Sequence, residues 1–212
     1  PDVTAFYEKP FRKNLRRLYA GQSWQKPSRK CDYYFGHHES HAAAGYYTSP
    51  FDECNILVID AIGEWDTISI WEATTEKKHL GHVTHKLKKI KSWKYPYSLG
   101  LLYSAITERI GLIPNEEEYI TMGMAAFGEP IYDLGDQLWE NNHKGCGNIF
   151  PEARLEDLAA SVQDLYERAL LKLVELCPHE NLILMGGCAL NCVANSKIKG
   201  KNIWIMPAAS DA

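Results

Sequence analysis

The chain has 212 residues, of which 45% are hydrophobic and 24% charged, and its formal net charge is -4. These values fit a globular protein with one large core or two small ones. They exclude a disordered chain and a generally basic nucleic-acid-binding surface. Its six cysteines occur without a secretory signal, so we expect reduced thiols and a cytoplasmic location. No apolar run approaches the roughly 20 residues of a membrane-spanning helix, and we expect no membrane partner.

The first 36 residues predict only short elements. We expect a short strand over 3–7, a solvated Arg-rich amphipathic helix around 12–17, and a brief strand over 31–35. The chain starts at Pro1 rather than at a methionine, and it stops just after an apparent strand. We therefore expect residues 1–212 to be a fragment of a longer protein.

Three histidines follow the brief strand, at the start of a predicted helix. His37 and His41 are four residues apart, so on a helix their rings project from one face and can bind one divalent metal. The ring of His38 then projects from a different face of the helix. The three alanines at 42–44 allow this helix to lie close to the elements that supply the remaining ligands.

A hairpin with an acidic tip comes next. The apolar run 55–59 predicts a buried strand that ends at Asp60, and the alternating segment 67–73 predicts its half-buried partner. The tip at 61–64 contains Gly63 and Glu64. Because such a tip can place backbone N–H groups and an aspartate beside a phosphate or its metal, Gly63 and Glu64 are candidate cofactor-binding residues.

A lysine-rich stretch up to Lys94 contains His79, His82 and His85 at intervals of three. A second metal site is one interpretation. Residues three apart on a strand face opposite sides, however, so a solvated edge strand is the better prediction.

The middle of the chain predicts helices. Ser98 is a plausible cap for a helix over 99–110, and the apolar spacing of 155–177 predicts the longest helix, which belongs to the core. Between them lies an acidic loop with glutamates at 116–118, followed by small residues at 121–128. Such a loop is usually a solvated turn, but its position between two packed segments makes Glu118 a candidate ligand contact.

A second buried strand is predicted over 181–185, followed by Gly186, Gly187 and a helical run over 188–195. Strand, glycine pair and helix form an arrangement that lets the backbone approach a nucleotide. Asn191 and Asn195 are four residues apart. Their side chains either contact a base or ribose, or take part only in packing of the helix. Cys188 and Cys192 have the same spacing and are more typical of small buried residues than of ligands.

The last predicted strand, 202–207, is followed by Asp211, which parallels Asp60 at the exit of an earlier strand. The order of elements favours an α/β layered fold, in which ligands bind at the carboxyl ends of strands. Two imidazoles and one or two carboxylates suit Fe(II), Mn(II) or Zn(II). These ligand types can bind any of the three ions, and Fe(II) is the ion that we expect first.

Six segments carry short motifs in a fixed order: 36–42, 60–64, 95–103, 118–119 with 122–125, 186–191 and 207–212. Together they resemble successive signatures of the O-carbamoyltransferase family, of the nodulation-factor and antibiotic type. The resemblance runs over most of the chain from about Phe6 onward.

The resemblance implies an actin/Hsp70-like ATPase fold, related to the tRNA threonylcarbamoyl-transfer enzymes. It implies that carbamoyl phosphate and ATP give carbamoyl adenylate, whose carbamoyl group passes to a hydroxyl of a sugar or other natural product. It also implies metal ligands at His37, His41, Asp60 and Asp211, and nucleotide contacts at Glu118, Gly186, Gly187 and Asn191. His38 is either the base that activates the hydroxyl or a packing histidine.

The sequence departs from the family pattern in several places. Ala61 stands where a glycine more often follows the aspartate, and the family's first strand and phosphate loop have no counterpart. The C-terminal domain that forms the adenylate is also absent, so we expect the fragment to lack complete activity. Threonylcarbamoyl transfer to tRNA and a non-catalytic nucleotide- or metal-binding module are the alternatives. We expect a small-molecule partner rather than a nucleic acid, and a homodimer stays open.

Overall fold

The computed structural model describes residues 2–26, 30–77 and 83–211. Its strands are β1 (Ala5–Phe6), β2 (Tyr33–Tyr34), β3 (Glu53–Ile59), β4 (Asp66–Lys77), β5 (Val83–Lys94), β6 (Asn181–Met185) and β7 (Asn202–Ile205). Its α-helices are α1 (Pro10–Tyr19), α2 (His37–Thr48), α3 (Leu99–Arg109), α4 (Glu118–Met124), α5 (Leu155–Glu175) and α6 (Cys192–Asn195). The helix and strand positions predicted from the sequence are confirmed, apart from their exact ends and the run over 188–195.

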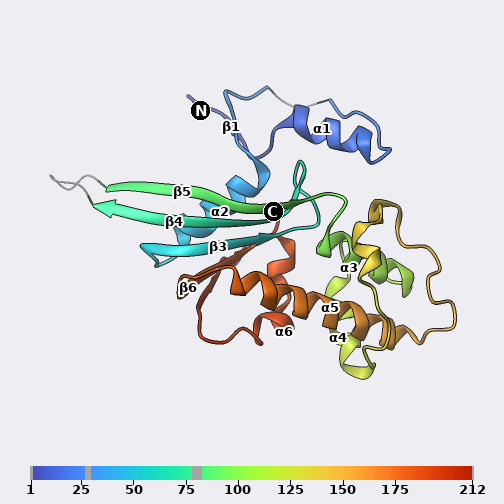
Figure 1. The fold of residues 1–212 in the computed structure, drawn as a ribbon. Coiled ribbons are helices and arrows are strands. Elements are labelled where there is room, and N and C mark those ends of the chain that lie inside the picture. The colour runs from blue at the N-terminus through green and yellow to red at the C-terminus, as the bar shows by residue number, and fades with distance from the viewer. Residues whose placement is uncertain (1, 27–29, 78–82, 212) are drawn as a thin grey trace.

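A mixed five-stranded sheet in the order β5-β4-β3-β6-β7 forms the centre of the molecule (Figure 1). β3 pairs with β4 in antiparallel and with β6 in parallel orientation. Side chains from both faces of β3 are buried, including Ile56, Leu57 and Val58, each 0% exposed. A central strand is covered on both faces, which explains its continuous apolar run.

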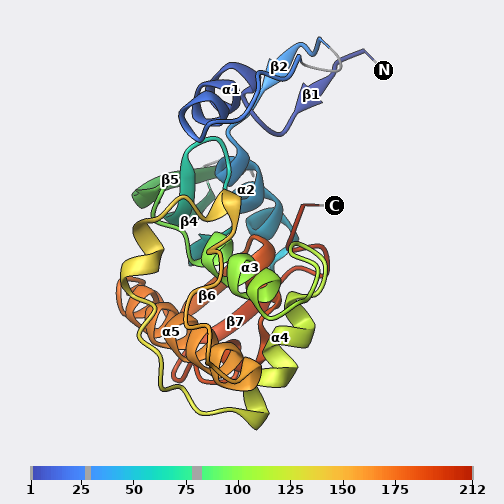
Figure 2. The same ribbon diagram turned by 90° about the vertical axis from the view of Figure 1, so that its right-hand side faces the viewer.

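Helices cover the two faces of this sheet (Figures 1 and 2). α2 packs on one face, where a Cβ added to Gly45 would lie 2.7 Å from Met185 Cγ. α5 packs on the other face, where Tyr166 and Leu170 meet Leu57 and Leu184 around a small apolar void. The layered α/β prediction is therefore confirmed.

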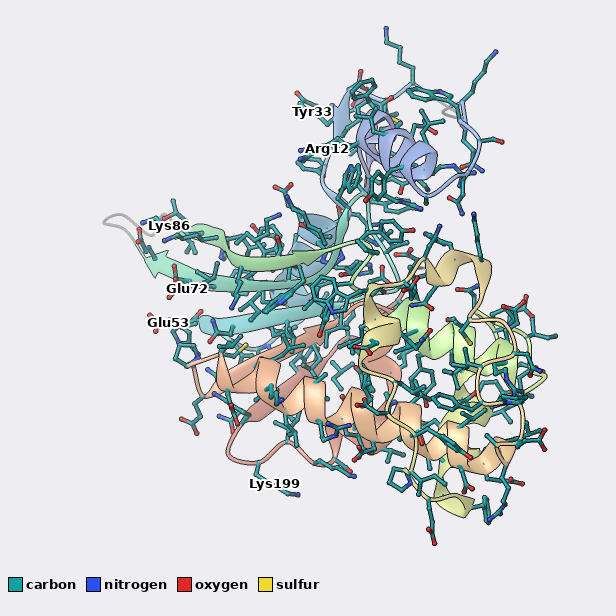
Figure 3. All side chains as sticks on the ribbon, turned by 45° about the vertical axis from the view of Figure 1, so that its right-hand side comes forward. Arg12, Tyr33, Glu53, Glu72, Lys86 and Lys199 are labelled. Atoms are coloured by element: carbon teal, nitrogen blue, oxygen red, sulfur yellow. The ribbon has the colours of Figure 1, made fainter. Side chains whose placement is uncertain are left out.

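β5 is an edge strand, as the lysine-rich stretch predicts. Figure 3 shows Lys86 near the free end of the long β4–β5 ribbon. His85 lies on β5, and its Nδ1 is 3.1 Å from the Thr75 hydroxyl. His79 and His82 lie outside the described residues.

The N-terminal segment with β1, α1 and β2 projects from the rest of the molecule (Figures 1 and 3). Its helix is confirmed, but the expectation that the basic side of α1 is solvated is wrong for one arginine. Arg16 is only 4% exposed and donates to the Glu64 carbonyl, whereas Phe11 is 65% exposed. The polar side of α1 packs inward because Arg16 finds acceptors there.

The helical run expected over 188–195 is interrupted. A 3-10 turn covers Gly187–Leu190, and α6 begins after Asn191, whose side chain accepts from the Ala194 N–H. Asn191 favours such a cap because its carbonyl oxygen can satisfy a free backbone donor at a helix start. None of the helices in the described part of the chain is both long and apolar enough to cross a bilayer.

Candidate metal centre

The start of α2 brings two histidine rings together. His37 Nε2 and His41 Nε2 are 3.2 Å apart, as the spacing of four residues predicts. The Glu64 carboxylate accepts from the backbone N–H groups of His37 and Lys9, at 3.3 Å and 2.6 Å. An acidic group at a helix N-terminus satisfies free donors and complements the helix dipole. Glu64 therefore fixes the helix start at the hairpin tip.

Two carboxylates from distant strands complete the cluster. Asp60, directly after β3, places Oδ2 2.8 Å from His37 Nε2 and 3.7 Å from His41 Nε2. Asp211, after β7, places Oδ1 3.4 Å and 3.0 Å from the same two nitrogens. The segment after β7 therefore reaches the start of α2 (Figures 1 and 2).

The four side chains fit a divalent metal. One ligand atom from each lies within 4.8 Å of all the others. Bonds of about 2.0–2.2 Å to a tetrahedral ion would place neighbouring ligands roughly 3.3–3.6 Å apart. The pairs that include a histidine nitrogen lie 2.8–3.7 Å apart, which is close to that spacing. Two carboxylates balance the charge of a divalent ion, and the imidazoles add none once they bind it in their neutral form. His37, His41 and Asp60 are buried, while the Asp211 side chain is 54% exposed.

Charge coupling holds the cluster together. Burial would raise the pKa of Asp60, but hydrogen bonds from His37 and His41 outweigh it and hold that pKa well below its usual value. Burial would lower the pKa of His41, but Asp211 and Asp60 outweigh it and raise that pKa to about 9. The Asp60 carboxylate is therefore ionised and available as a ligand, and a metal would displace the proton of His41.

His38 points to a different set of partners, as its position in the helix predicts. Its Nδ1 lies 2.7 Å from the Ser69 hydroxyl, which also accepts from the Trp71 indole at 2.8 Å. Its Nε2 is buried with no hydrogen-bond partner among the described residues. Burial lowers the pKa of His38 to about 4, so the ring is neutral. Its role as a base stays a prediction.

Two glycines are required by close packing around the cluster. A Cβ at Gly63 would lie 2.9 Å from His38 Cδ2 and 3.1 Å from His37 Cδ2. Gly186 has a φ of +87°, and its added Cβ would lie 2.2 Å from the Ile59 carbonyl oxygen. Gly187 differs, because the nearest atom outside its chain neighbours would be Asp60 Oδ1, at 3.5 Å. The space above Gly187 is open beside the ligand carboxylate.

Two further candidate residues are engaged in internal contacts. Glu118 accepts from the Ser104 hydroxyl and, at 2.6 Å, from the Asn115 N–H. Asn191 exchanges two hydrogen bonds with Gln163, at 2.9 Å and 3.1 Å. Asn191 therefore packs the turn after β6, one of the two roles expected for it. Nucleotide contacts at Glu118 and Asn191 stay predictions.

A family model described as "Carbamoyltransferase N-terminus" matches residues 4–148 and 139–212. The chain belongs to the carbamoyltransferase family. An uncharacterised protein of Synechocystis is 38% identical over 83% of the chain, and the match covers 34% of that relative. The Nodulation protein NolNO of Sinorhizobium fredii is 27% identical over 84% of the chain, covering 29% of that protein. The chain spans about a third of the length of these two relatives.

Solved structures show the fold alone. The activator of the 2-hydroxyisocaproyl-CoA dehydratase from Clostridium difficile, solved with bound ADPNP, covers 84% of the chain with a TM-score of 0.53 and 13% identity. Component A of the Acidaminococcus fermentans (R)-2-hydroxyglutaryl-CoA dehydratase covers the same share with a TM-score of 0.50 and 11% identity. The carbamoyltransferase chain thus has the actin-like ATPase fold that the resemblance implies.

The sequence did not reveal several residues that support the candidate metal centre. Ser98, expected only as a helix cap, also donates to the Ala61 carbonyl at 2.6 Å. Arg16 donates to the Glu64 carbonyl, and Gln163 holds Asn191. The capping position identified Ser98, but no local signal in the sequence identifies the long-range partners.

Proposed function

We propose that the full-length protein containing this chain transfers a carbamoyl group to a hydroxyl of a sugar or other natural product. Carbamoyl phosphate and ATP supply the group as carbamoyl adenylate. Family membership supports carbamoyl transfer, and the main structural support is the set of four ligand atoms from His37, His41, Asp60 and Asp211, within 4.8 Å of one another.

His37, His41, Asp60 and Asp211 would hold the metal, with Fe(II) proposed first and Mn(II) or Zn(II) as alternatives. When bound, the ion supplies Lewis-acid polarisation of a carbonyl or phosphoryl oxygen. The open space at Gly187 leaves room for the adenylate phosphate beside Asp60. The Ala61 N–H donates to Asp60 Oδ1, at 2.7 Å.

The chain's own residues position the reacting groups. Glu64 fixes the start of α2, and Gly63 allows the hairpin tip to approach the histidine rings. We assign Glu118, Gly186, Gly187 and Asn191 to the walls of the nucleotide site. His38 is a candidate base through Nε2, which has no partner among the described residues and can accept a proton when Nδ1 donates to the Ser69 hydroxyl.

The test uses the full-length protein with ATP and radiolabelled carbamoyl phosphate. Pyrophosphate release reports adenylate formation, and labelled product from a pool of host metabolites reports transfer. His41→Ala should lower transfer by more than about a hundredfold while pyrophosphate release continues, because the missing ligand affects only the transferase centre.

His85→Ala is the matched control, since His85 lies on the edge strand β5 outside the cluster. It should leave both reactions unchanged. Undiminished transfer by His41→Ala would contradict the proposed role of the metal centre. Mass spectrometry of the labelled product identifies the acceptor.

A further inference from the structure

The outer face of α1 is apolar and exposed. Phe11, Leu15 and Leu18 are spaced by four and three residues, so they lie on one face of the helix. Their side chains are 65%, 43% and 50% exposed. Trp24 is 48% exposed and packs edge-on against Phe11, with the ring centroids 6.1 Å apart. We call these four side chains the α1 face. A surface helix of a globular protein normally turns such an apolar stripe toward a core.

Hydrogen bonds hold the α1 face in a fixed shape. Asn14 is only 3% exposed, and it exchanges two hydrogen bonds of 2.7 Å with the backbone N–H and carbonyl of Gln25. Arg17 donates to the Ser23 carbonyl at 2.9 Å. These bonds keep the turn after α1, and with it Trp24, beside the helix. The exposed aromatic pair is therefore part of an ordered surface.

The inner side of α1 is tied to the rest of the molecule. Arg16 donates to the Glu64 carbonyl at 3.3 Å, and the Lys9 N–H donates to the Glu64 carboxylate. Just before α1, the Tyr7 carbonyl accepts from the Ser40 hydroxyl of α2 at 3.1 Å. The helix could turn its apolar stripe inward only by breaking these contacts. The α1 face thus points away from the central sheet.

The two short strands beside α1 indicate that the missing cover is a polypeptide. β1 and β2 pair in parallel, Ala5 with Tyr33 and Phe6 with Tyr34. Among the described residues neither strand pairs with a third, and Tyr33 is 57% exposed (Figure 3). Parallel strands are normally covered on both faces, and an isolated pair is marginally stable. Only another protein segment supplies both backbone hydrogen bonds and apolar cover.

Charge indicates the chemistry of that segment. Residues 9–30 contain eight lysines and arginines and no aspartate or glutamate, although the whole chain has a net charge of -4. Arg12 is exposed beside the α1 face (Figure 3). A second copy of so basic a surface would be repelled, whereas carboxylates would be attracted. The complementary surface is therefore apolar with acidic groups at its rim.

The full-length protein itself has room for such a surface. The region shared with this chain is only 34% and 29% of two relatives. A segment of the same polypeptide is present at high effective concentration. We propose that the α1 face docks on an apolar, carboxylate-rimmed surface of the same full-length protein, formed by residues outside 1–212. This inference is independent of the reaction proposed above.

Hydroxyl-radical footprinting of the full-length protein, read by mass spectrometry, tests the docking. Phe11 and Trp24 should be oxidised at least about fivefold more slowly in the wild type than in Leu15→Asp, because that carboxylate would be desolvated and repelled in the contact. Ile90→Asp is the matched control, since Ile90 is 51% exposed on β5, and it should give the wild-type rates. Equal oxidation of Phe11 and Trp24 in the wild type and in folded Leu15→Asp would overturn the proposal.

Zero-length carbodiimide crosslinking identifies the occupant of the α1 face. In a mixture of isotopically light and heavy full-length protein, Lys26, which is exposed, should crosslink to an aspartate or glutamate outside 1–212 of the same isotopic form. Crosslinks that join the light and heavy forms would assign the face to a second copy and overturn the proposal. Protection of Phe11 and Trp24 that appears only after anionic lipid vesicles are added would overturn it as well.

Discussion

A methyl group added at Gly63 would touch the rings of His37 and His38, at 3.1 Å and 2.9 Å. Gly63→Ala should therefore shift a metal ligand and weaken metal binding at least about tenfold, because ligand orientation controls affinity. Competition with a chelator measures this change. Gly123→Ala is the control, since its added Cβ meets nothing within 4 Å, and its metal affinity should equal that of the wild type. Equal affinity in Gly63→Ala would show that the tip is not needed to place the histidines.

The burial of His143, with Arg16 Nη1 3.0 Å from its Nε2, predicts a pH dependence of stability. The pKa of His143 is about 4 in the folded protein, below the ordinary value of 6.5. The unfolded chain therefore binds the extra proton first, so the contact's stabilisation is complete above about pH 6.5 and is lost as pH falls toward 4. Urea unfolding at pH 7 and pH 5 should show a smaller loss in His143→Gln than in the wild type. Equal losses would contradict the neutral state of His143.

At the scale of residues, the sequence predicts the metal ligands but not their supports. His37 and His41 follow from helical spacing, and Asp60 and Asp211 from their places at strand exits. Glu64 is different, because its bonds to the start of α2 depend on where the hairpin tip lies in three dimensions. No local pattern contains that information.

Helix α3 is the element that positions the loop after Asp60. Ser98 accepts from the Leu101 N–H and donates to the Ala61 carbonyl, and it is 0% exposed. Ser98→Ala should lower the free energy of unfolding by about 1–2 kcal/mol, because it removes a helix cap and the hydrogen bond to the partly buried Ala61 carbonyl. Chemical denaturation measures this loss. Ser196→Ala is the control, since the Ser196 hydroxyl is exposed and its removal should be nearly neutral.

Elements differ in how far their sequence determines them. β3 and β6 are predictable because a long apolar run is buried on both faces of a central strand. The orientation of α1 is not predictable, because its apolar Phe11 is exposed and its charged Arg16 is buried, the reverse of the usual distribution. The break at Asn191 also escapes prediction, because the pairing with Gln163 joins residues 28 positions apart in sequence.

At the scale of the whole molecule, the sheet and helices hold residues from three separated parts of the chain at one point. The start of α2, the end of β3 and the segment after β7 meet there. Two low-identity structures share this actin-like fold, and family membership comes from the sequence match. The fold thus explains why ligands 174 positions apart in sequence, His37 and Asp211, can form one cluster.

The metal content of the full-length protein, purified without oxygen and analysed by mass spectrometry, tests the central claim most directly. We predict about one divalent ion per chain in the wild type. Asp60→Asn, which keeps the shape of the side chain but removes its charge, should lose most of that metal, and Asp164→Asn on the surface of α5 should retain it. A wild-type protein without metal, or Asp60→Asn with undiminished metal, would contradict the assignment of the four ligands.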